Sequence, residues 1–168
     1  MTDIIDLLVF EEGFRSKPYL DTESYPTAGI GFLLAKRKCT KSELKEFYDF
    51  ELPREAAEAW LEILLRQVHA GMMKDAGIRA AYTKCVNAHP TTGWDTNPRI
   101  AVLLSMGYQM GVDGLAKFTT TLGHIAAGRF TDAAGAMLRS KWAKQTPRRA
   151  ARHATQMATG QWAEEYLE

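Results

Sequence analysis

The chain has 168 residues, a length that suits one domain with a substantial core, divided into lobes or not. Hydrophobic residues make up 46% and charged residues 24%, which is typical of globular proteins and excludes disorder, collagen and coiled-coil repeats. The 21 basic and 20 acidic residues give a net charge of +1, so charge alone indicates no polyanionic partner. Two cysteines form no disulfide framework, and we expect both Cys39 and Cys85 to be reduced and near the core.

The N-terminus has the wrong composition for an export signal. Its first charges are acidic and Asp6 interrupts its apolar run, whereas a signal peptide has a basic start and a longer apolar core. The longest strongly apolar stretch, 100–112, is too short to cross a bilayer. We therefore expect a protein that is made in the cytoplasm, has no signal peptide and does not insert into a membrane.

Helices flanking a short β region are predicted along the chain. The first helix is expected to begin after a Thr2 cap and to end at Gly13, with Glu12 on its apolar face. Residues 14–34 combine strand-forming residues with prolines and glycines, which predicts three short strands. The sequence 40–43 is a capping box for a short helix.

The rest of the chain is expected to be helical. A long helix is predicted from about Pro53 to Asp75, roughly 35 Å in length and able to join two lobes. Shorter helices are predicted over 78–86 and 99–109, with a loop over 89–96 between them, and further helices should start near 119, 131 and 146.

These elements predict a single α+β domain with two lobes. The small β-containing lobe is expected over 14–52, and the larger helical lobe over 1–13 and 53–168.

The sequence lacks the motifs of several common kinds of functional site. The four histidines show no metal-ligand spacing, so we expect no metal site. Gly29-Ile30-Gly31 lacks the third glycine of a dinucleotide loop, and no Gly-x-Ser-x-Gly elbow supports a serine nucleophile. No cofactor is expected.

Glu12 and Asp21 remain as a pair of carboxylates. Glu12 should be partly buried at the negative end of the first helix, whereas Asp21 is expected in a polar turn. Two carboxylates with different environments are what glycoside hydrolysis requires. The residues alone nevertheless favour the alternative interpretation, in which both are solvated surface carboxylates.

Around this pair, Glu12-Gly13 is followed by Asp21-Thr22 and by Thr27-Ala28-Gly29-Ile30-Gly31. The order and spacing of these motifs resemble the active-site hairpin of the phage-type lysozymes, the muramidases of T-even bacteriophages and their relatives (glycoside hydrolase family 24). The resemblance implies a lysozyme-like fold with a cleft between the two lobes. Downstream matches extend the resemblance over most of the chain: Gln109-Met110-Gly111, Phe118-Thr119, Ser140-Lys141-Trp142, Gln145-Thr146-Pro147 and Thr159-Gly160.

This resemblance implies a role for each residue of the hairpin. Glu12 would be the general acid that protonates the glycosidic oxygen, while Asp21 and Thr27 would hold the attacking water on the opposite face of the sugar. Such an inverting arrangement needs carboxyl groups about 6.5 to 9.5 Å apart.

The resemblance also implies roles outside the hairpin. Arg149 would hold the catalytic acid as a structural clamp, and Leu33, Ser105 and Gln109 would contact substrate. Ser24 stands where the family usually has a turn glycine.

Positive charge and tryptophans offer further surface hypotheses. The stretch 133–163 has no acidic residue and six basic ones, which could attract an anionic cell wall, bind nucleic acid or simply be solvated. Trp60 and Trp142 fit apolar helical patterns and are expected in the core, whereas Trp94 is the exposed candidate for stacking on a sugar.

The expected function is that of an endolysin-type muramidase, which cleaves the β-1,4 bond between N-acetylmuramic acid and N-acetylglucosamine for host cell lysis. Its partner would be a glycan strand of peptidoglycan, reached from the host cytoplasm through a separate holin, and the protein would be a monomer. A domain of the same fold that binds cell wall or nucleic acid without catalysis is the alternative.

Overall fold

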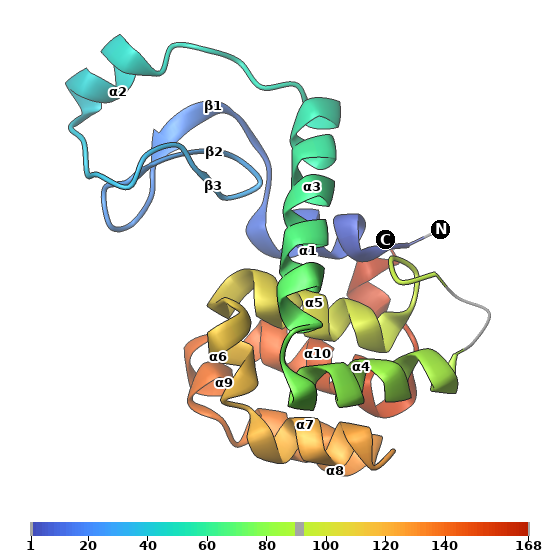
Figure 1. Cartoon of the computed structure of the whole chain (residues 1–168). Coiled ribbons are helices and arrows are strands. Elements are labelled where there is room, and N and C mark those ends of the chain that lie inside the picture. Colours follow the sequence, from blue (N-terminus) through green and yellow to red (C-terminus); the bar gives the residue numbers. More distant parts are fainter. Residues whose placement is uncertain (1, 90–92, 168) are drawn as a thin grey trace. The chain divides into compact units, whose positions relative to one another are not determined.

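The computed structural model describes residues 2–89 and 93–167, and it divides the chain into two compact units (Figure 1). We call residues 8–64 the small unit, and residues 1–7 together with 65–168 the helical unit. The boundaries at Leu8 and Leu64 lie inside helices, whereas the lobes expected from the sequence meet in loops. Part of the predicted loop over 89–96 lies outside the described residues.

The small unit contains a three-stranded antiparallel sheet with strands in chain order: β1 (Arg15–Leu20), β2 (Pro26–Gly29) and β3 (Phe32–Leu33). Helix α1 (Ile4–Glu12) precedes the sheet, and α2 (Lys41–Phe47) follows it. Ala28 and Phe32, two buried hydrophobic residues of the sheet, are direct cross-strand partners on one face. The α+β class predicted from the sequence is confirmed.

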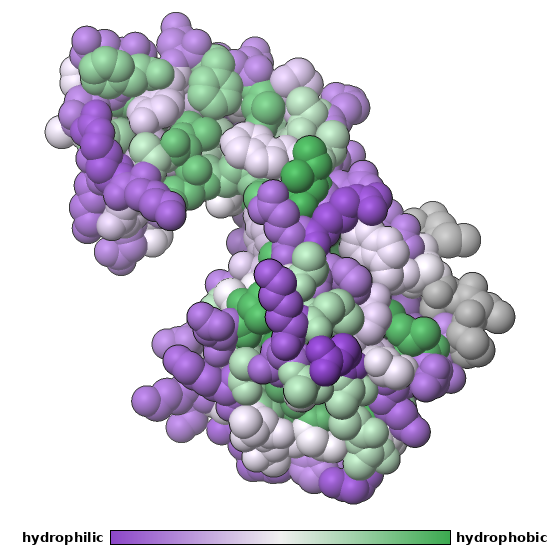
Figure 2. All heavy atoms as spheres, in the orientation of Figure 1, coloured by the Kyte–Doolittle hydropathy of each residue, from purple (hydrophilic) through white to green (hydrophobic). Residues whose placement is uncertain are grey.

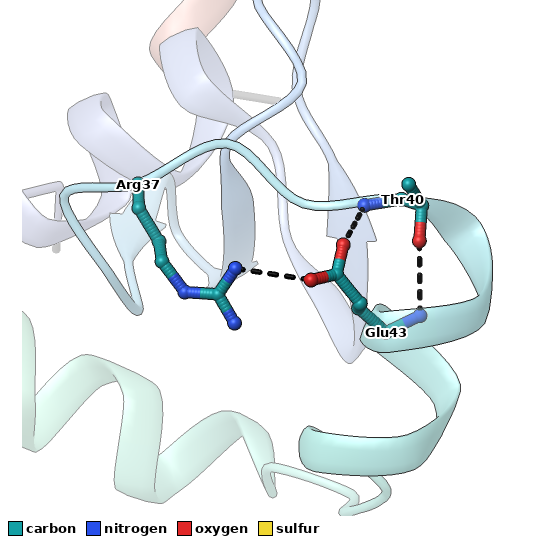
Figure 3. Close-up of polar contacts among 3 residues, drawn as sticks. All are labelled: Arg37, Thr40 and Glu43. Carbon is teal, nitrogen blue, oxygen red and sulfur yellow. Dashed lines mark hydrogen bonds and ion pairs between the residues drawn. The ribbon is translucent and has the colours of Figure 1, made fainter.

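No residue of helix α2 is buried, so capping hydrogen bonds rather than core packing stabilise this helix. The Thr40 hydroxyl accepts a hydrogen bond from the backbone N–H of Glu43, and the Glu43 carboxylate accepts one from the N–H of Thr40 at 2.7 Å (Figure 3). Arg37 forms an ion pair with the other oxygen of the Glu43 carboxylate, at 3.1 Å. The predicted capping box is therefore present.

Helix α3 (Arg54–Met72) begins where the sequence predicts and ends three residues before the expected Asp75. It ends there because the Asp75 side chain accepts a hydrogen bond from the N–H of Ile78 and so starts the next helix, α4 (Ala76–Ala88). Trp60, expected in the core, is 38% exposed, and its ring packs on Phe32 with 4.4 Å between centroids.

The helical unit continues with α5, which is almost entirely buried, and five further helices. Helix α8 packs on α7 and α10, and α4 packs on α7. The sequence did not predict the short helices α6 and α9 as separate elements. The bounds are α5 (Pro98–Met110), α6 (Val112–Ala116), α7 (Thr119–Ala126), α8 (Phe130–Leu138), α9 (Lys141–Gln145) and α10 (Pro147–Thr159), followed by a 3₁₀ turn over Glu164–Tyr166.

The first helix is capped by a different residue from the one predicted. The Asp3 carboxylate accepts hydrogen bonds from the N–H groups of Ile5 and Asp6, at 2.7 and 3.0 Å. The hydroxyl of Thr2, the predicted cap, instead donates to the carbonyl of Tyr166 at 3.2 Å. Thr2 therefore makes a long-range hydrogen bond instead of the local capping bond that its sequence position predicts.

Candidate active site

Glu12 is the last residue of α1, and its side chain is half-buried. Gly13 ends the helix with a φ of +73°, a conformation that favours glycine. The turn between β2 and β3 lies close to the carboxylate: a Cβ atom at Gly31 would be 3.8 Å from Glu12 Oε2. Glycine at this position therefore leaves open space beside the carboxylate.

Asp21 directs the turn between β1 and β2. One oxygen of its carboxylate, Oδ1, accepts hydrogen bonds from the N–H groups of Glu23 at 2.9 Å and Tyr25 at 2.8 Å. Ser24, the substitute for the usual glycine, adopts a φ of +70° in this turn. The turn thus keeps a left-handed residue without a glycine, and the half-buried Asp21 carboxylate retains its second oxygen for other partners.

Thr27 lies in the middle strand, between two cross-strand partners. Tyr19 of β1 and Leu33 of β3 are both paired with it, so the three side chains share one face of the sheet. Thr27 is 4% exposed and its hydroxyl donates to the carbonyl of Tyr25 at 3.2 Å, whereas Leu33 is 47% exposed. The face opposite the buried core thus carries a hydroxyl flanked by an aromatic and an exposed aliphatic side chain.

Tyr19 links the two carboxylates electrostatically. Burial raises the pKa of its phenol, the guanidinium of Arg15 lowers it, and the negative charges of Asp21 and Glu12 raise it further. The Arg15 guanidinium lies 4.3 Å from the centre of the Tyr19 ring. The charges of both carboxylates therefore influence the pKa of one aromatic side chain. Sequence reasoning missed Tyr19, although it lies only two residues before Asp21.

In the helical unit, Arg149 is the third residue of α10, as predicted, and it is buried. Its Nη2 donates to the hydroxyl of Ser105 at 2.8 Å, and that hydroxyl also bonds to His153 Nε2 at 2.7 Å. Ser105 has no exposed surface. This burial argues against the direct substrate contact expected for Ser105, and it makes Ser105 a partner of Arg149.

Gln109 differs from Ser105 because it lies at the surface of the helical unit. Its Oε1 accepts a hydrogen bond from Trp142 Nε1 at 2.7 Å, and Trp142 is buried as predicted. Trp142 also lines a cavity of about 670 Å³ whose charged residues are the cations Lys117, Arg139 and Lys141. Trp94, the predicted exposed tryptophan, is half-buried and lies against His69, with 6.4 Å between ring centroids.

Cys39 and Cys85 are both free and buried, as the sequence indicated. Among residues 2–89 and 93–167, no group of three His, Cys, Asp or Glu side chains is arranged to hold a metal ion. Within the same residues, no helix is both long and apolar enough to cross a membrane.

The chain is similar to phage lysozymes and T4-type lysozymes. The family model for phage lysozymes matches residues 10–153. Two probable T4-type lysozymes of Dictyostelium discoideum are 27% and 28% identical over 164 and 165 residues, each covering 95% of this chain and 96% of the relative. The pre-baseplate central spike protein Gp5 of Enterobacteria phage T4 is 32% identical over 160 residues, which cover 92% of this chain but only 27% of the spike protein.

The matched region contains every residue of the hairpin motif and the buried Arg149. The family and the enzyme class expected from the sequence are therefore confirmed. The chain belongs to the phage lysozyme family, a family of glycoside hydrolases that act as lysozymes.

Proposed function

We propose that this protein is an inverting muramidase that hydrolyses the β-1,4 bond between N-acetylmuramic acid and N-acetylglucosamine in peptidoglycan. The observation that carries the proposal is the grouping of Glu12, Asp21 and Thr27 around the sheet of the small unit. A Cβ atom at Gly31, in the turn after β2, would lie 3.8 Å from Glu12 Oε2, and Asp21 and Thr27 belong to the β1–β2 hairpin of the same sheet.

In this mechanism Glu12 is the general acid, and its proton goes to the oxygen of the glycosidic bond as that bond breaks. The Asp21 carboxylate takes a proton from the attacking water as its oxygen bonds to the anomeric carbon. The backbone N–H bonds to Oδ1 keep that carboxylate in place while its other oxygen binds the water. The Thr27 hydroxyl is a second, neutral group that orients the same water.

The exposed side chains indicate which groups would contact the substrate. Leu33, exposed beside Thr27, would pack against a sugar ring, and exposed Gln109 would bond to the glycan or its peptide. Arg149 would keep the role of structural clamp that the family resemblance implies for it. In the cell, such an enzyme would act as a monomeric endolysin that leaves the host cytoplasm through a separate holin and lyses the wall from the periplasm.

The Glu12→Gln variant tests the acid. Because an amide cannot deliver the proton, we expect the clearing of outer-membrane-permeabilised Gram-negative cells to slow by about 10²- to 10⁴-fold, with an unchanged melting temperature. The neighbouring Glu11→Gln variant is the matched control and should keep the wild-type rate. A Glu12→Gln enzyme with half the wild-type rate would remove Glu12 from the mechanism.

Stereochemistry tests the role of Asp21. If Asp21 and Thr27 activate a water, the first product released from the β-linked glycan is the α anomer, which proton NMR detects in the first minutes of digestion. If the β anomer appears first, Asp21 acts as a nucleophile and the two carboxyl groups lie only about 5 to 5.5 Å apart.

A further inference from the structure

A chain of hydrogen bonds leads from Arg149 into the core of the helical unit. Arg149 Nη2 donates to Ser105 Oγ at 2.8 Å, and Ser105 Oγ lies 2.7 Å from His153 Nε2. On the other side of the imidazole, His153 Nδ1 lies 3.3 Å from the hydroxyl of Tyr166, to which Arg152 Nε also donates at 3.3 Å. Ser105 and His153 are both completely buried.

The positions of the protons in this chain follow from the partners of Ser105. Its oxygen already accepts from Arg149, and the only other hydrogen-bonding group it meets among the described residues is His153 Nε2. The hydroxyl proton therefore goes to Nε2, which must be unprotonated. The proton of the neutral imidazole then sits on Nδ1 and points to the Tyr166 oxygen.

The surroundings keep the imidazole neutral and fixed. Burial holds the pKa of His153 well below its usual range, and the cations Arg149 and Arg152 lower it further. The ring packs between aromatic side chains, with centroid distances of 5.9 Å to Trp142 and 6.5 Å to Tyr166. An acceptor for the Ser105 proton is therefore held in one place.

We propose that Ser105 and His153 are positioning residues, which fix the orientation of the Arg149 guanidinium for catalysis. Because a guanidinium is a rigid planar fork, anchoring Nη2 on Ser105 sets the directions of its other N–H groups. The effect of this anchor on the reaction rests on the proposed function, in which Arg149 serves as a structural clamp. Ser105 thus acts through Arg149 rather than on the glycan.

The His153→Phe variant keeps a ring but removes the acceptor for Ser105. We expect kcat to fall by about 10- to 100-fold with an unchanged KM, which is the scale of a misplacement of up to an ångström. The His153→Gln variant, which can again accept the Ser105 proton, should recover most of that loss. The matched control is Gln156→Leu, which removes another fully buried polar side chain of α10 that bonds elsewhere and should leave kcat unchanged below its melting temperature.

Combining variants separates positioning from general destabilisation. In an Arg149→Lys background, which lacks the planar fork, the His153→Phe change should lower kcat no further. If the His153→Phe change lowered kcat by the same factor in the Arg149→Lys background as in the wild type, the proposal would be overturned. A wild-type kcat in the single His153→Phe variant would overturn it as well. If His153→Phe does not fold, Ser105→Ala breaks the same chain with a smaller change and is judged by the same criteria.

A measurement without substrate distinguishes this proposal from the proposed function. Nitrogen NMR should show slow rotation of the Arg149 guanidinium in the wild type and His153→Gln, and at least a severalfold faster rotation in Ser105→Ala and His153→Phe. Equal rotation rates in all four proteins would overturn the anchor. Normal lysis by Glu12→Gln would overturn the proposed function alone, and the rotation rates would still decide whether Arg149 is anchored.

Discussion

The small unit and the helical unit differ in what they expose and in the sign of their charge. Of the nine large hydrophobic side chains exposed among the described residues, six belong to the small unit, and Figure 2 shows hydrophobic and hydrophilic residues mixed on its visible face. The small unit has eight basic and eleven acidic residues, a net charge of −3. The helical unit has thirteen basic and nine acidic residues, a net charge of +4.

Burial of polar groups also differs between the two units. In the small unit, Asp21 has a carboxylate that is only half-buried and belongs to a surface turn. In the helical unit, Arg149, Ser105 and His153 are bonded to one another inside the core. The small unit therefore keeps a carboxylate accessible to solvent, whereas these polar groups of the helical unit satisfy one another in its core. The six exposed hydrophobic residues of the small unit are Phe10, Leu33, Phe47, Phe50, Trp60 and Ile63.

The largest expected effect tests where the stability resides. The Leu104→Ala variant empties a fully buried position of α5, and we expect the free energy of unfolding to fall by about 2 to 5 kcal/mol. The Ile63→Ala variant truncates a side chain that is 57% exposed in the small unit, and its cost should stay within about 0.5 kcal/mol. Denaturant titration measures both. An equal cost for the two would mean that the hydrophobic surface of the small unit is covered in solution.

The next effect separates the structural from the chemical role of Asp21. The Asp21→Asn variant can still accept the two backbone N–H bonds of the turn, so its melting temperature should stay close to that of the wild type. Losing the carboxylate should nevertheless lower kcat by about 100-fold or more. The Asp21→Ala variant should lose stability as well as activity. If Asp21→Asn remained fully active, the turn rather than the charge would explain why an aspartate occupies this position.

Local signals made much of the small unit predictable. The strands of 14–34 and the capping box of Thr40 and Glu43 depend on residues that are close in sequence, so their patterns are visible without the fold. The motif of Glu12, Asp21 and Thr27 is local for the same reason. Its proposed chemical roles came from the family resemblance, because two carboxylates nine residues apart do not by themselves determine a distance.

Long-range contacts account for most of what the sequence did not predict. Thr2 was the predicted helix cap, but its hydroxyl bonds to a carbonyl 164 positions away. Trp60 fits an apolar helical pattern, yet it lies on the exposed side of Phe32. His153 was considered only as a possible metal ligand or part of a basic stretch. A signal was available, because His153 and Arg149 are four residues apart on one helical face, but its partner Ser105 lies on another helix.

The opposite charges of the two units predict how salt affects lysis. Of the six cations in the 133–163 stretch, Arg149 is buried and Arg152 is half-buried, so the exposed ones are Arg139, Lys141, Lys144 and Arg148. If these residues attract an anionic wall, lysis should slow as salt rises, because surface fields are screened over about 8 Å at physiological ionic strength. Hydrolysis of a short neutral glycan should respond much less.

Matched charge reversals locate this effect in one unit. The double variant Arg139→Glu and Lys144→Glu should lyse cells severalfold more slowly at low salt and should lose most of its salt dependence. The same charge change at Lys41 and Lys45 of the small unit is the control and should have little effect. Fluorescence anisotropy with duplex DNA tests the rival interpretation of these cations, because a nucleic-acid site would show a salt slope of roughly −0.9 per phosphate contact. Submicromolar DNA binding at physiological salt without glycan cleavage would contradict the muramidase proposal, whereas salt-sensitive lysis confined to the helical-unit cations would assign them to wall attraction.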